Sequence, residues 1–397
     1  MKSTIDIHDI DKRLASAKRL VAKSNPITKR NSELISKFED YGFTISLSKK
    51  RITKYVYSLR KLAEWLDKDF DQATKHDIEN LVLFIEKKDY SAWTKHDYKV
   101  IIKRFYKWLK GNDETYPDEV KWIKTTLKKK DVVLPEELLS EDEIKRLVDS
   151  ALSIRDKAFI ISLYESGARI GELGEMHCND VVFEDRYTTL MLSGKTGSRR
   201  VIVVASTPYL NTWLQNHPLR DDPSAPLWVN MGTVNRYKAM SYPGLVKILK
   251  TASKKAGLRK RVAPHLLRHS RATFLASRIT EAQMNHIFGW KQGSDMPSIY
   301  VHLSGRDVDD AILGVYGLKK SEEEKPKLTP KICPRCQQSN VYDGKFCSKC
   351  GLALDINAAA QIEAARMKTD DIMNVLMEDE EFRDLLKKKL KELNPKT

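Results

Sequence analysis

Four side chains at widely separated positions have the types needed to act on a phosphate group. Arg169 lies in the stretch YESGARIGEL, and His265 and Arg268 lie in APHLLRHSRATFLA. Tyr300 follows a Gly/Ser/Asp/Pro loop in GWKQGSDMPSIY. A tyrosine is a weak nucleophile at its ordinary pKa, so attack on phosphorus requires cationic neighbours and a proton acceptor. Guanidinium groups clamp phosphate oxygens and an imidazole transfers a proton, so this set could meet both requirements.

Arg169 and Tyr300 each have an ordinary interpretation as well. A helix ends near Ser166-Gly167, and Arg169 would stand in the first turn after this glycine-permitted bend. There it could bind a phosphate beside helix N–H groups, or it could simply pair with Glu172. Tyr300 on its own is most simply a packed tyrosine with one wet edge.

The second basic motif places two chemical groups on one helix face. His265 and Arg268 are three residues apart, which on a helix puts both side chains on the same side. The histidine could handle a proton while the arginine neutralises a phosphate oxygen. The alternative is a half-exposed helix, in which His269 and Arg271 are unremarkable neighbours.

A hairpin is predicted within YTTLMLSGKTGSRRVIVV. Two β-prone runs flank a Gly-Lys-Thr-Gly-Ser tip. Lys195 at this tip would extend on a mobile arm, where it could protonate a leaving oxygen. Lysines at hairpin tips are usually solubilising turn residues, so the motif predicts chemistry only in combination with the others.

In their chain order these motifs resemble the tyrosine recombinases, or phage-type integrases. The resemblance covers roughly residues 40–318 and rests on A-R-x-G-E-L, the hairpin lysine, H-x-x-R, and a G-W dipeptide upstream of the tyrosine. It implies that two arginines clamp the scissile phosphate, that the lysine protonates the 5′ oxygen, and that the tyrosine becomes attached to the 3′ phosphate. The implied catalytic residues are Arg169, Lys195, His265, Arg268, Trp290 and Tyr300, with Glu172 in support of the site.

Three features depart from the pattern of the family. Ten residues separate Trp290 from Tyr300, one more than in many members, and the Gly293-Ser294 loop can absorb the difference. A second tyrosine, Tyr316, lies downstream and is an alternative nucleophile. A cysteine module follows the catalytic region, which is unusual for the family.

That module has the spacing C-x2-C-x10-C-x2-C with a glycine after the last cysteine. Four thiolates at this spacing can close a tetrahedral Zn²⁺ site in a segment too small to form a hydrophobic core. The spacing predicts a structural zinc ribbon, since it implies no open ligand position. Cys178 stands apart and is most simply a small core residue. The predicted ligands are Cys333, Cys336, Cys347 and Cys350.

The charge of the 397-residue chain is strongly basic and unevenly distributed. The net charge is +16, and residues 1–130 hold 30 Lys and Arg against 19 Asp and Glu. Residues 321–397 are balanced, with 14 of each sign. A basic surplus in the first two thirds is typical of a protein that binds a phosphate backbone. No apolar run is long enough to cross a bilayer and no hydrophobic signal core is apparent, so a cytoplasmic protein without a membrane partner is expected.

Hydrophobic periodicity predicts a mainly α protein with a small antiparallel β-sheet in an α+β catalytic domain. Ser140 and Glu143 form a capping-box pattern, which places the start of the second domain near residue 135. The predicted parts are a polar N-terminal arm at 1–30, a helical core-binding domain that contacts DNA at 31–130, the catalytic domain at 135–320, the zinc ribbon at 331–352 and an amphipathic helix at 356–393.

The predicted function is that of a site-specific recombinase that cleaves and rejoins double-stranded DNA through a 3′-phosphotyrosine. The reaction needs neither ATP nor a catalytic metal, because the phosphotyrosine conserves the energy of the phosphodiester. The resemblance implies a homotetramer on two DNA sites. The alternative is a non-catalytic DNA-binding protein of the same fold that uses its zinc ribbon for regulation or partner recruitment. Target sequence, accessory proteins, and the choice between integration, excision and dimer resolution stay open.

Overall fold

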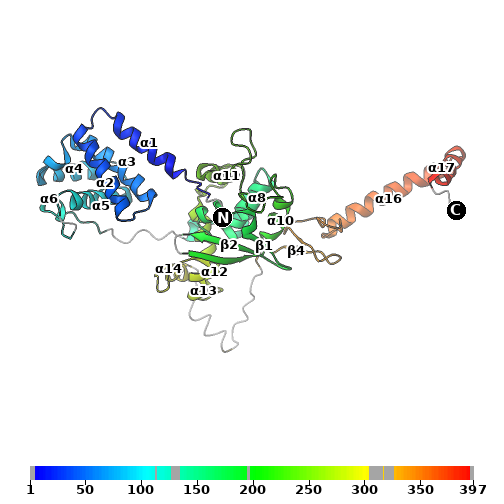
Figure 1. Ribbon diagram of the computed structural model, residues 1–397. Coiled ribbons are helices and arrows are strands. Elements are labelled where there is room, and N and C mark those ends of the chain that lie inside the picture. The colour runs from blue at the N-terminus through cyan, green and yellow to red at the C-terminus, as the bar shows by residue number, and fades with distance from the viewer. Residues whose placement is uncertain are drawn as a thin grey trace. The chain divides into compact units, whose positions relative to one another are not determined.

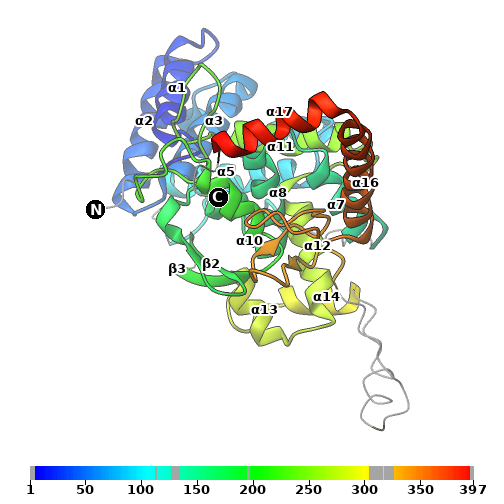
Figure 2. The same ribbon diagram turned by 90° about the vertical axis from the view of Figure 1, so that its right-hand side faces the viewer.

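The chain divides into two compact units, one of residues 6–133 and one that runs from residue 134 to the C-terminus. A computed structural model describes residues 5–111, 114–126, 135–194, 197–303, 316 and 326–393. Each unit has its own helices (Figures 1 and 2) and its own buried apolar residues.

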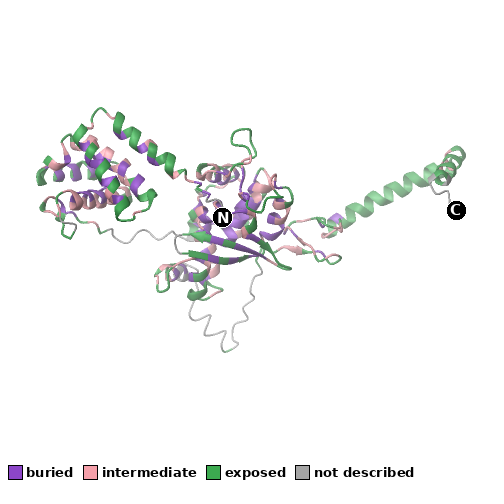
Figure 3. Ribbon diagram, viewed as in Figure 1, coloured by how far each residue is buried: buried purple, intermediate pink, exposed green. Residues whose placement is uncertain are grey.

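The first unit is entirely helical among its described residues. Buried aliphatic and aromatic side chains fill its centre, including Phe38, Phe70 and Phe105, whose rings meet at centroid distances of 5.2 and 4.8 Å. In Figure 3 the buried residues of these helices turn toward the inside of the unit. The helices are α1 (Ile10–Lys23), α2 (Lys29–Thr44), α3 (Lys49–Leu66), α4 (Lys75–Lys87), α5 (Ala92–Leu109) and α6 (Asp118–Lys121), with a 3₁₀ turn at Phe70–Gln72.

The first helix differs from the polar arm that the sequence predicted at 1–30. Leu14, Ala17 and Val21 are buried and belong to the core of the first unit. Helix α1 packs against α3, so this segment is part of the folded unit. The physical reason is visible in the spacing: apolar residues three and four apart make one narrow apolar face on an otherwise charged helix.

The second unit surrounds a buried helix with further helices and a three-stranded antiparallel sheet. The helices of its main body are α7 (Glu141–Asp149), α8 (Ile154–Ser166), α9 (Ile170–Gly174), α10 (Thr207–Gln215), α11 (Tyr242–Lys255), α12 (Pro264–Ala276), α13 (Glu281–Phe288) and α14 (Met296–Leu303). Its strands are β1 (Val181–Phe183), β2 (Thr188–Gly194) and β3 (Gly197–Val203), in that order across the sheet, and 3₁₀ turns lie at Pro135–Glu137 and Cys178–Asp180.

This architecture confirms the predicted fold class, a mainly helical protein with a small antiparallel sheet. The predicted capping box is present at the start of α7, where the Ser140 hydroxyl accepts from the Glu143 N–H and the Glu143 carboxylate accepts from the Ser140 N–H. The predicted hairpin is also present, with Leu190 opposite Val201 in the β2–β3 register. Both buried residues face the helices.

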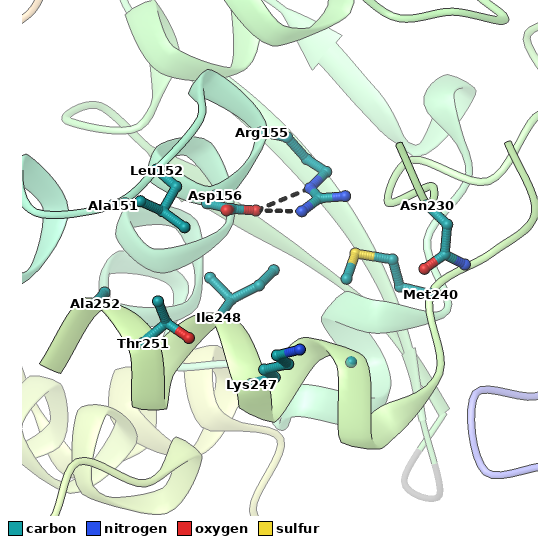
Figure 4. A pocket seen from close by; sticks show the side chains of 11 residues that line it. Ala151, Leu152, Arg155, Asp156, Asn230, Met240, Lys247, Ile248, Thr251 and Ala252 are labelled. Atoms are coloured by element: carbon teal, nitrogen blue, oxygen red, sulfur yellow. Dashed lines mark hydrogen bonds and ion pairs between the residues drawn. The ribbon is translucent and has the colours of Figure 1, made fainter. Parts of the chain in front are cut away.

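Helix α8 is buried along almost its whole length, which agrees with its apolar sequence AFIISLY. At its first turn the Arg155 guanidinium donates two hydrogen bonds to one oxygen of Asp156, at 2.9 and 2.6 Å. Figure 4 shows this pair beside a cavity that α11 closes with Lys247 and Ile248. Arg155 also donates to the Val229 carbonyl at 2.8 Å, which fixes the loop before α11 to α8.

The four cysteines lie in a small ribbon with two short strands, β4 (Lys331–Ile332) and β5 (Ser339–Asn340). Tyr342 ties the ribbon to the main body of the second unit, because its hydroxyl donates to the Asp149 carboxylate at the end of α7 at 2.6 Å. The ammonium group of Lys145, also on α7, lies 5.1 Å from the centroid of the Tyr342 ring. The ribbon is therefore attached to α7 through a polar and a cation–π contact.

The C-terminal segment forms two helices where the sequence predicted one over 356–393. They are α16 (Ile356–Glu378) and α17 (Glu380–Leu393). Asp379 has extended backbone angles and its carboxylate accepts from the Phe382 N–H at 2.9 Å, so it ends one helix and caps the next. Within α16 only Ala358 is buried. None of the helices in the described part of the chain combines the length and apolar character that a bilayer span needs.

Candidate active site

Arg169 is held by a carboxylate at the end of helix α8. Gly167 terminates α8 in the left-handed region at φ 58°, and a Cβ there would lie 2.3 Å from the Phe288 ring, so only glycine fits. The next helix begins at once, and Glu172 accepts from both the Arg169 N–H at 2.9 Å and its Nη1 at 2.8 Å. Arg169 therefore forms the ion pair with Glu172 that the sequence offered as the alternative interpretation, and its side chain stays 39% exposed.

Glu172 is held in turn by a residue that the sequence interpretation missed. Arg199 on β3 donates from Nη2 to Glu172 Oε2 at 2.7 Å, and both side chains are buried. Burial alone would raise the pKa of Glu172, but the hydrogen bonds from Arg199 and from the Arg169 N–H outweigh it and lower the pKa. The carboxylate is therefore ionised at neutral pH and orients the Arg169 guanidinium.

Arg199 links three parts of the site. Besides Glu172 it contacts the end of α13, where its Nε donates to the Ile287 carbonyl at 2.8 Å. Its Nη1 is buried and has no hydrogen-bond partner among the described residues. Strand alternation could have revealed it, because Arg199 occupies the same inward face as Val201 and Val203. A charged residue on a buried strand face must find a partner.

The predicted hairpin lysine, Lys195, lies outside the described residues. Its neighbour Gly194 lies against the site, since a Cβ there would be 2.6 Å from Glu172 Oε1. Gly194 pairs with Gly197 at the end of the β2–β3 ladder. The turn end of the β2–β3 ladder therefore packs directly on the carboxylate that orients Arg169.

Arg268 is buried and held by backbone carbonyl groups. Its Nη1 donates to the Gly167 carbonyl at 2.6 Å and its Nη2 to the Phe288 carbonyl at 2.7 Å. Its guanidinium carbon lies 5.1 Å from the Phe288 ring centroid and 5.5 Å from that of Trp290. Burial, followed by the charge of Arg169, lowers the pKa of Arg268 to about 10, so the group stays cationic at neutral pH.

His265 lies one helical turn before Arg268 on α12 and is exposed. Partial burial of the ring lowers its pKa, and the positive charges of Arg268 and Arg169 lower it further. The imidazole is therefore mostly neutral at neutral pH and able to accept a proton. His265 and Arg268 lie one turn apart on α12, and Arg268 donates to the carbonyl of Gly167, two residues before Arg169, so the fold places these three predicted residues in one region.

Tyr300 on α14 is buried, with 3% of its surface exposed, and stacks on the predicted Trp290. The two rings are 5.4 Å apart and nearly parallel, at an angle of 4°. Burial raises the pKa of Tyr300 to about 12, and the charge of Arg268 opposes the rise. The phenol is therefore within electrostatic reach of one predicted arginine. Its ring belongs to an apolar cluster with Met284 and Phe288.

The Tyr300 hydroxyl bonds to His269, which the sequence interpretation had treated as an unremarkable neighbour. The Oη of Tyr300 lies 2.5 Å from His269 Nδ1, and the rings are 5.7 Å apart at 29°. The signal available in the sequence was position alone: His269 follows Arg268 directly. The alternative nucleophile, Tyr316, is 74% exposed.

The four predicted zinc ligands converge at one point. All four sulfur atoms lie within 4.8 Å of one another. Cys333 Sγ is 3.6 Å from Cys350 Sγ, and Cys336 Sγ is 3.5 Å from Cys347 Sγ. A disulfide requires about 2.05 Å, whereas tetrahedral Zn–S bonds of about 2.3 Å put thiolates near the observed spacing. This donor set fits a structural zinc ion.

The remaining cysteine, Cys178, is half-buried and lies in a different part of the fold. Burial raises the pKa of its thiol to about 11, and the carboxylates of Asp222 and Asp180 raise it further. The thiol is therefore protonated at neutral pH. Cys178 is only half-buried, so it is not the core residue that the sequence predicted.

Comparison with known families gives a match within the second unit. The sequence of residues 137–306 is similar to the phage integrase family. The match begins just before α7 and includes every predicted catalytic position from Arg169 to Tyr300.

Proteins similar to the chain in sequence are named tyrosine recombinases. The chain is 28% identical over 288 residues to tyrosine recombinase XerA of Pyrococcus horikoshii, which covers 71% of this chain and 93% of the relative. It is 27% identical over 252 residues to tyrosine recombinase XerD of Bifidobacterium longum, covering 59% and 80%.

Solved structures share the fold at lower sequence identity. A lambda integrase dimer bound to a COC′ core site has a TM-score of 0.55 at 15% identity and covers 69% of this chain and 78% of that one. The XerH recombinase bound to its difH substrate has a TM-score of 0.52 at 18% identity, covering 76% and 97%. Both similarities bear on the fold of the chain.

Proposed function

We propose that the chain is a site-specific DNA recombinase that cleaves and rejoins strands through a covalent 3′-phosphotyrosine. The proposal rests on one arrangement above all: two arginines fixed by different anchors, Arg169 and Arg268, act on one histidine, and the second also acts on the Tyr300 phenol. The similarity to the phage integrase family and the named tyrosine recombinase relatives support it.

In the proposed reaction Tyr300 Oη attacks a scissile phosphate and the 5′ oxygen leaves. Arg169 and Arg268 stabilise the negative charge that builds on the phosphoryl oxygens, as fixed donors do in other transition states. Lys195 protonates the departing 5′ oxygen, the role that the family resemblance assigns to it, and His265 transfers protons beside the phosphate. A 5′ hydroxyl of the partner strand then reverses the step, so no ATP is consumed.

The proposed substrate is double-stranded DNA, and the proposed assembly is a homotetramer on two sites. The basic surplus of the first unit supplies the electrostatic attraction for a phosphate backbone. A lambda integrase tetramer bound to a Holliday junction shares the fold, with a TM-score of 0.54. The zinc ribbon is proposed to be structural and to lie outside the chemistry, because its four thiols leave no open ligand position.

A suicide-substrate assay tests the proposal. The full chain is incubated with a library of nicked duplexes of randomised sequence, on which the short cleaved strand diffuses away and traps protein on DNA. Covalent adducts are isolated under denaturing conditions and sequenced. Wild-type protein and Tyr316→Phe should form adducts on a common sequence, whereas Tyr300→Phe should form none. Adducts that persist in Tyr300→Phe and vanish in Tyr316→Phe would reassign the nucleophile.

The second candidate is a non-catalytic DNA-binding protein of the same fold. The burial of the Tyr300 hydroxyl favours it, because a buried phenol cannot reach DNA without a local movement of α14. Specific DNA binding by the wild-type chain without any covalent adduct would establish this candidate. Strand joining between two different duplexes would separate a recombinase from an enzyme that only nicks and closes one duplex.

A further inference from the structure

We propose that His269 accepts the phenolic proton of Tyr300 when this oxygen attacks phosphorus, an inference that rests on the proposed function. A general base must lie within hydrogen-bond reach of the proton that it removes. His269 Nδ1 meets this condition at 2.5 Å from Tyr300 Oη. With its proton on Nε2, the neutral imidazole presents the Nδ1 lone pair to the phenol.

The other groups around the phenol are poorly suited to accept its proton. Arg268 acts on Tyr300 as a positive charge, and a guanidinium carries only donors. Trp290 stacks on the ring and offers only an indole N–H. His265 lies one turn before His269 on α12, and the centroids of the two rings are 6.4 Å apart. Two histidines on one helix can therefore divide two proton transfers, His269 at the tyrosine and His265 at the phosphate.

The environment explains why a base is needed. Burial raises the pKa of Tyr300 to about 12, so the phenol would rarely ionise unaided at neutral pH. Tyr300 and His269 are carried by α14 and α12, which pack against each other, and Figures 1 and 2 show the two helices side by side with α13. A movement that brings Tyr300 to DNA can keep this contact if the two helices move little relative to each other.

The proposed step balances as follows. The Tyr300 O–H bond breaks and its proton passes to His269 Nδ1, which becomes part of an imidazolium ion. The phenolic oxygen forms the new O–P bond as the bond from phosphorus to the 5′ oxygen breaks, and that oxygen takes a proton from a separate acid. In the rejoining step the 5′ hydroxyl passes its proton to the conjugate base of that acid and attacks phosphorus. The bond from phosphorus to the Tyr300 oxygen breaks, and the imidazolium returns its proton to the departing phenolate.

The first measurement is the single-turnover cleavage rate on the suicide duplex at saturating protein. His269→Asn keeps a polar group near the Nδ1 position but has no basicity, so cleavage should slow by about 10²-fold or more. His286→Asn replaces an exposed histidine on α13 and is the matched control, with cleavage expected at the wild-type rate. A wild-type rate for His269→Asn would overturn the inference.

The second measurement separates proton transfer from packing. Tyr300 is replaced by a fluorinated tyrosine, whose phenol is more acidic, in both the wild-type and the His269→Asn chains. In the His269→Asn chain the more acidic phenol should raise the cleavage rate at least tenfold. In the wild-type chain it should change the cleavage rate much less. Equal effects in both chains would overturn the inference, because a packing role is insensitive to the acidity of the phenol.

A third measurement tests the inference in case His269→Asn does not fold. Added imidazole should accelerate cleavage by His269→Ala, since it can occupy the vacated space and accept the proton, and no acceleration would count against the inference. If the proposed function itself is wrong, the result differs: wild-type protein forms no Tyr300-dependent adduct on any duplex. That result overturns both proposals, whereas a Tyr300 adduct that is indifferent to His269 overturns only this one.

Discussion

The candidate active site and the cysteine ribbon are held together in opposite ways. The site draws Arg169, Arg199 and Arg268 from segments up to about 100 residues apart and fixes them with buried hydrogen bonds to Glu172 and to backbone carbonyls. The ribbon brings four thiols from one short segment to a single point and has little core of its own. Long-range packing positions the first region, whereas local ligand spacing positions the second. The two regions should therefore fail independently, and for different reasons.

Removal of the proposed metal should have the largest effect, and it should be confined to the ribbon. Structural zinc sites contribute on the order of 10 kcal/mol of binding free energy, and a segment of this size lacks a core to replace it. Chelation, or Cys347→Ser, should unfold residues 331–352 while DNA cleavage persists. Amide hydrogen exchange on the full chain would locate the loss of structure, and elemental analysis of the purified protein would count zinc. Absence of bound metal in a folded ribbon would refute the assignment.

Arg268→Lys should impair DNA cleavage and leave the ribbon folded. A lysine cannot serve the Gly167 and Phe288 carbonyls and a phosphate together, so single-turnover cleavage should fall by about 10³-fold. DNA affinity and zinc content should stay close to wild type. Arg278→Lys is the control, because Arg278 is exposed and lies just after the C-terminal end of α12. Cleavage by Arg268→Lys at near the wild-type rate would show that the carbonyl-anchored arginine is structural.

Arg199→Met tests the buried anchor of Glu172. Leaving this carboxylate buried without Arg199 should destabilise the second unit by about 3 kcal/mol and reduce cleavage about tenfold. Hydrogen bonding lowers the pKa of Glu172, so the stability from Arg199 is complete above the unfolded pKa near 4.5 and is lost as the pH falls through the folded one. Urea unfolding at several pH values should show a gap between the two proteins that narrows below pH 4.5. A gap independent of pH would reject the electrostatic explanation.

Tyr342→Phe probes the hydrogen bond between the ribbon and α7, and its effect should be the smallest. The change removes the hydrogen bond to Asp149 and keeps the ring against Lys145, so the expected loss is about 1 kcal/mol. Hydrogen exchange in the ribbon should rise while the cleavage rate stays unchanged. A tenfold loss of cleavage would mean that the ribbon controls the site.

The same contrast explains how much the sequence could predict. Local patterns predicted local structure well: the capping box at Ser140, the β2–β3 hairpin and the convergence of the four cysteines all depend on residues close in the chain. The H-x-x-R spacing likewise placed His265 and Arg268 one turn apart on α12.

What the sequence did not predict depends on contacts between distant segments or on a single capping residue. Arg199 matters because it meets Glu172, 27 residues earlier, and His269 because it meets Tyr300, 31 residues later. Strand alternation marks Arg199 as inward-facing, but it does not identify Glu172 as the partner, and nothing in local spacing pairs His269 with Tyr300. Asp379 split the C-terminal helix by capping a second one, which overrode a continuous helical pattern.

The most direct test of the central claim is to identify the amino acid that becomes attached to DNA. The wild-type chain is trapped on a nicked duplex, digested with protease and nuclease, and the nucleotide-linked peptide is sequenced by mass spectrometry. The account predicts one modified residue, Tyr300, with its phenolic oxygen bonded to the 3′ phosphate. A nucleotide on Tyr316 or on any other residue, or specific DNA binding with no linked peptide, would contradict it.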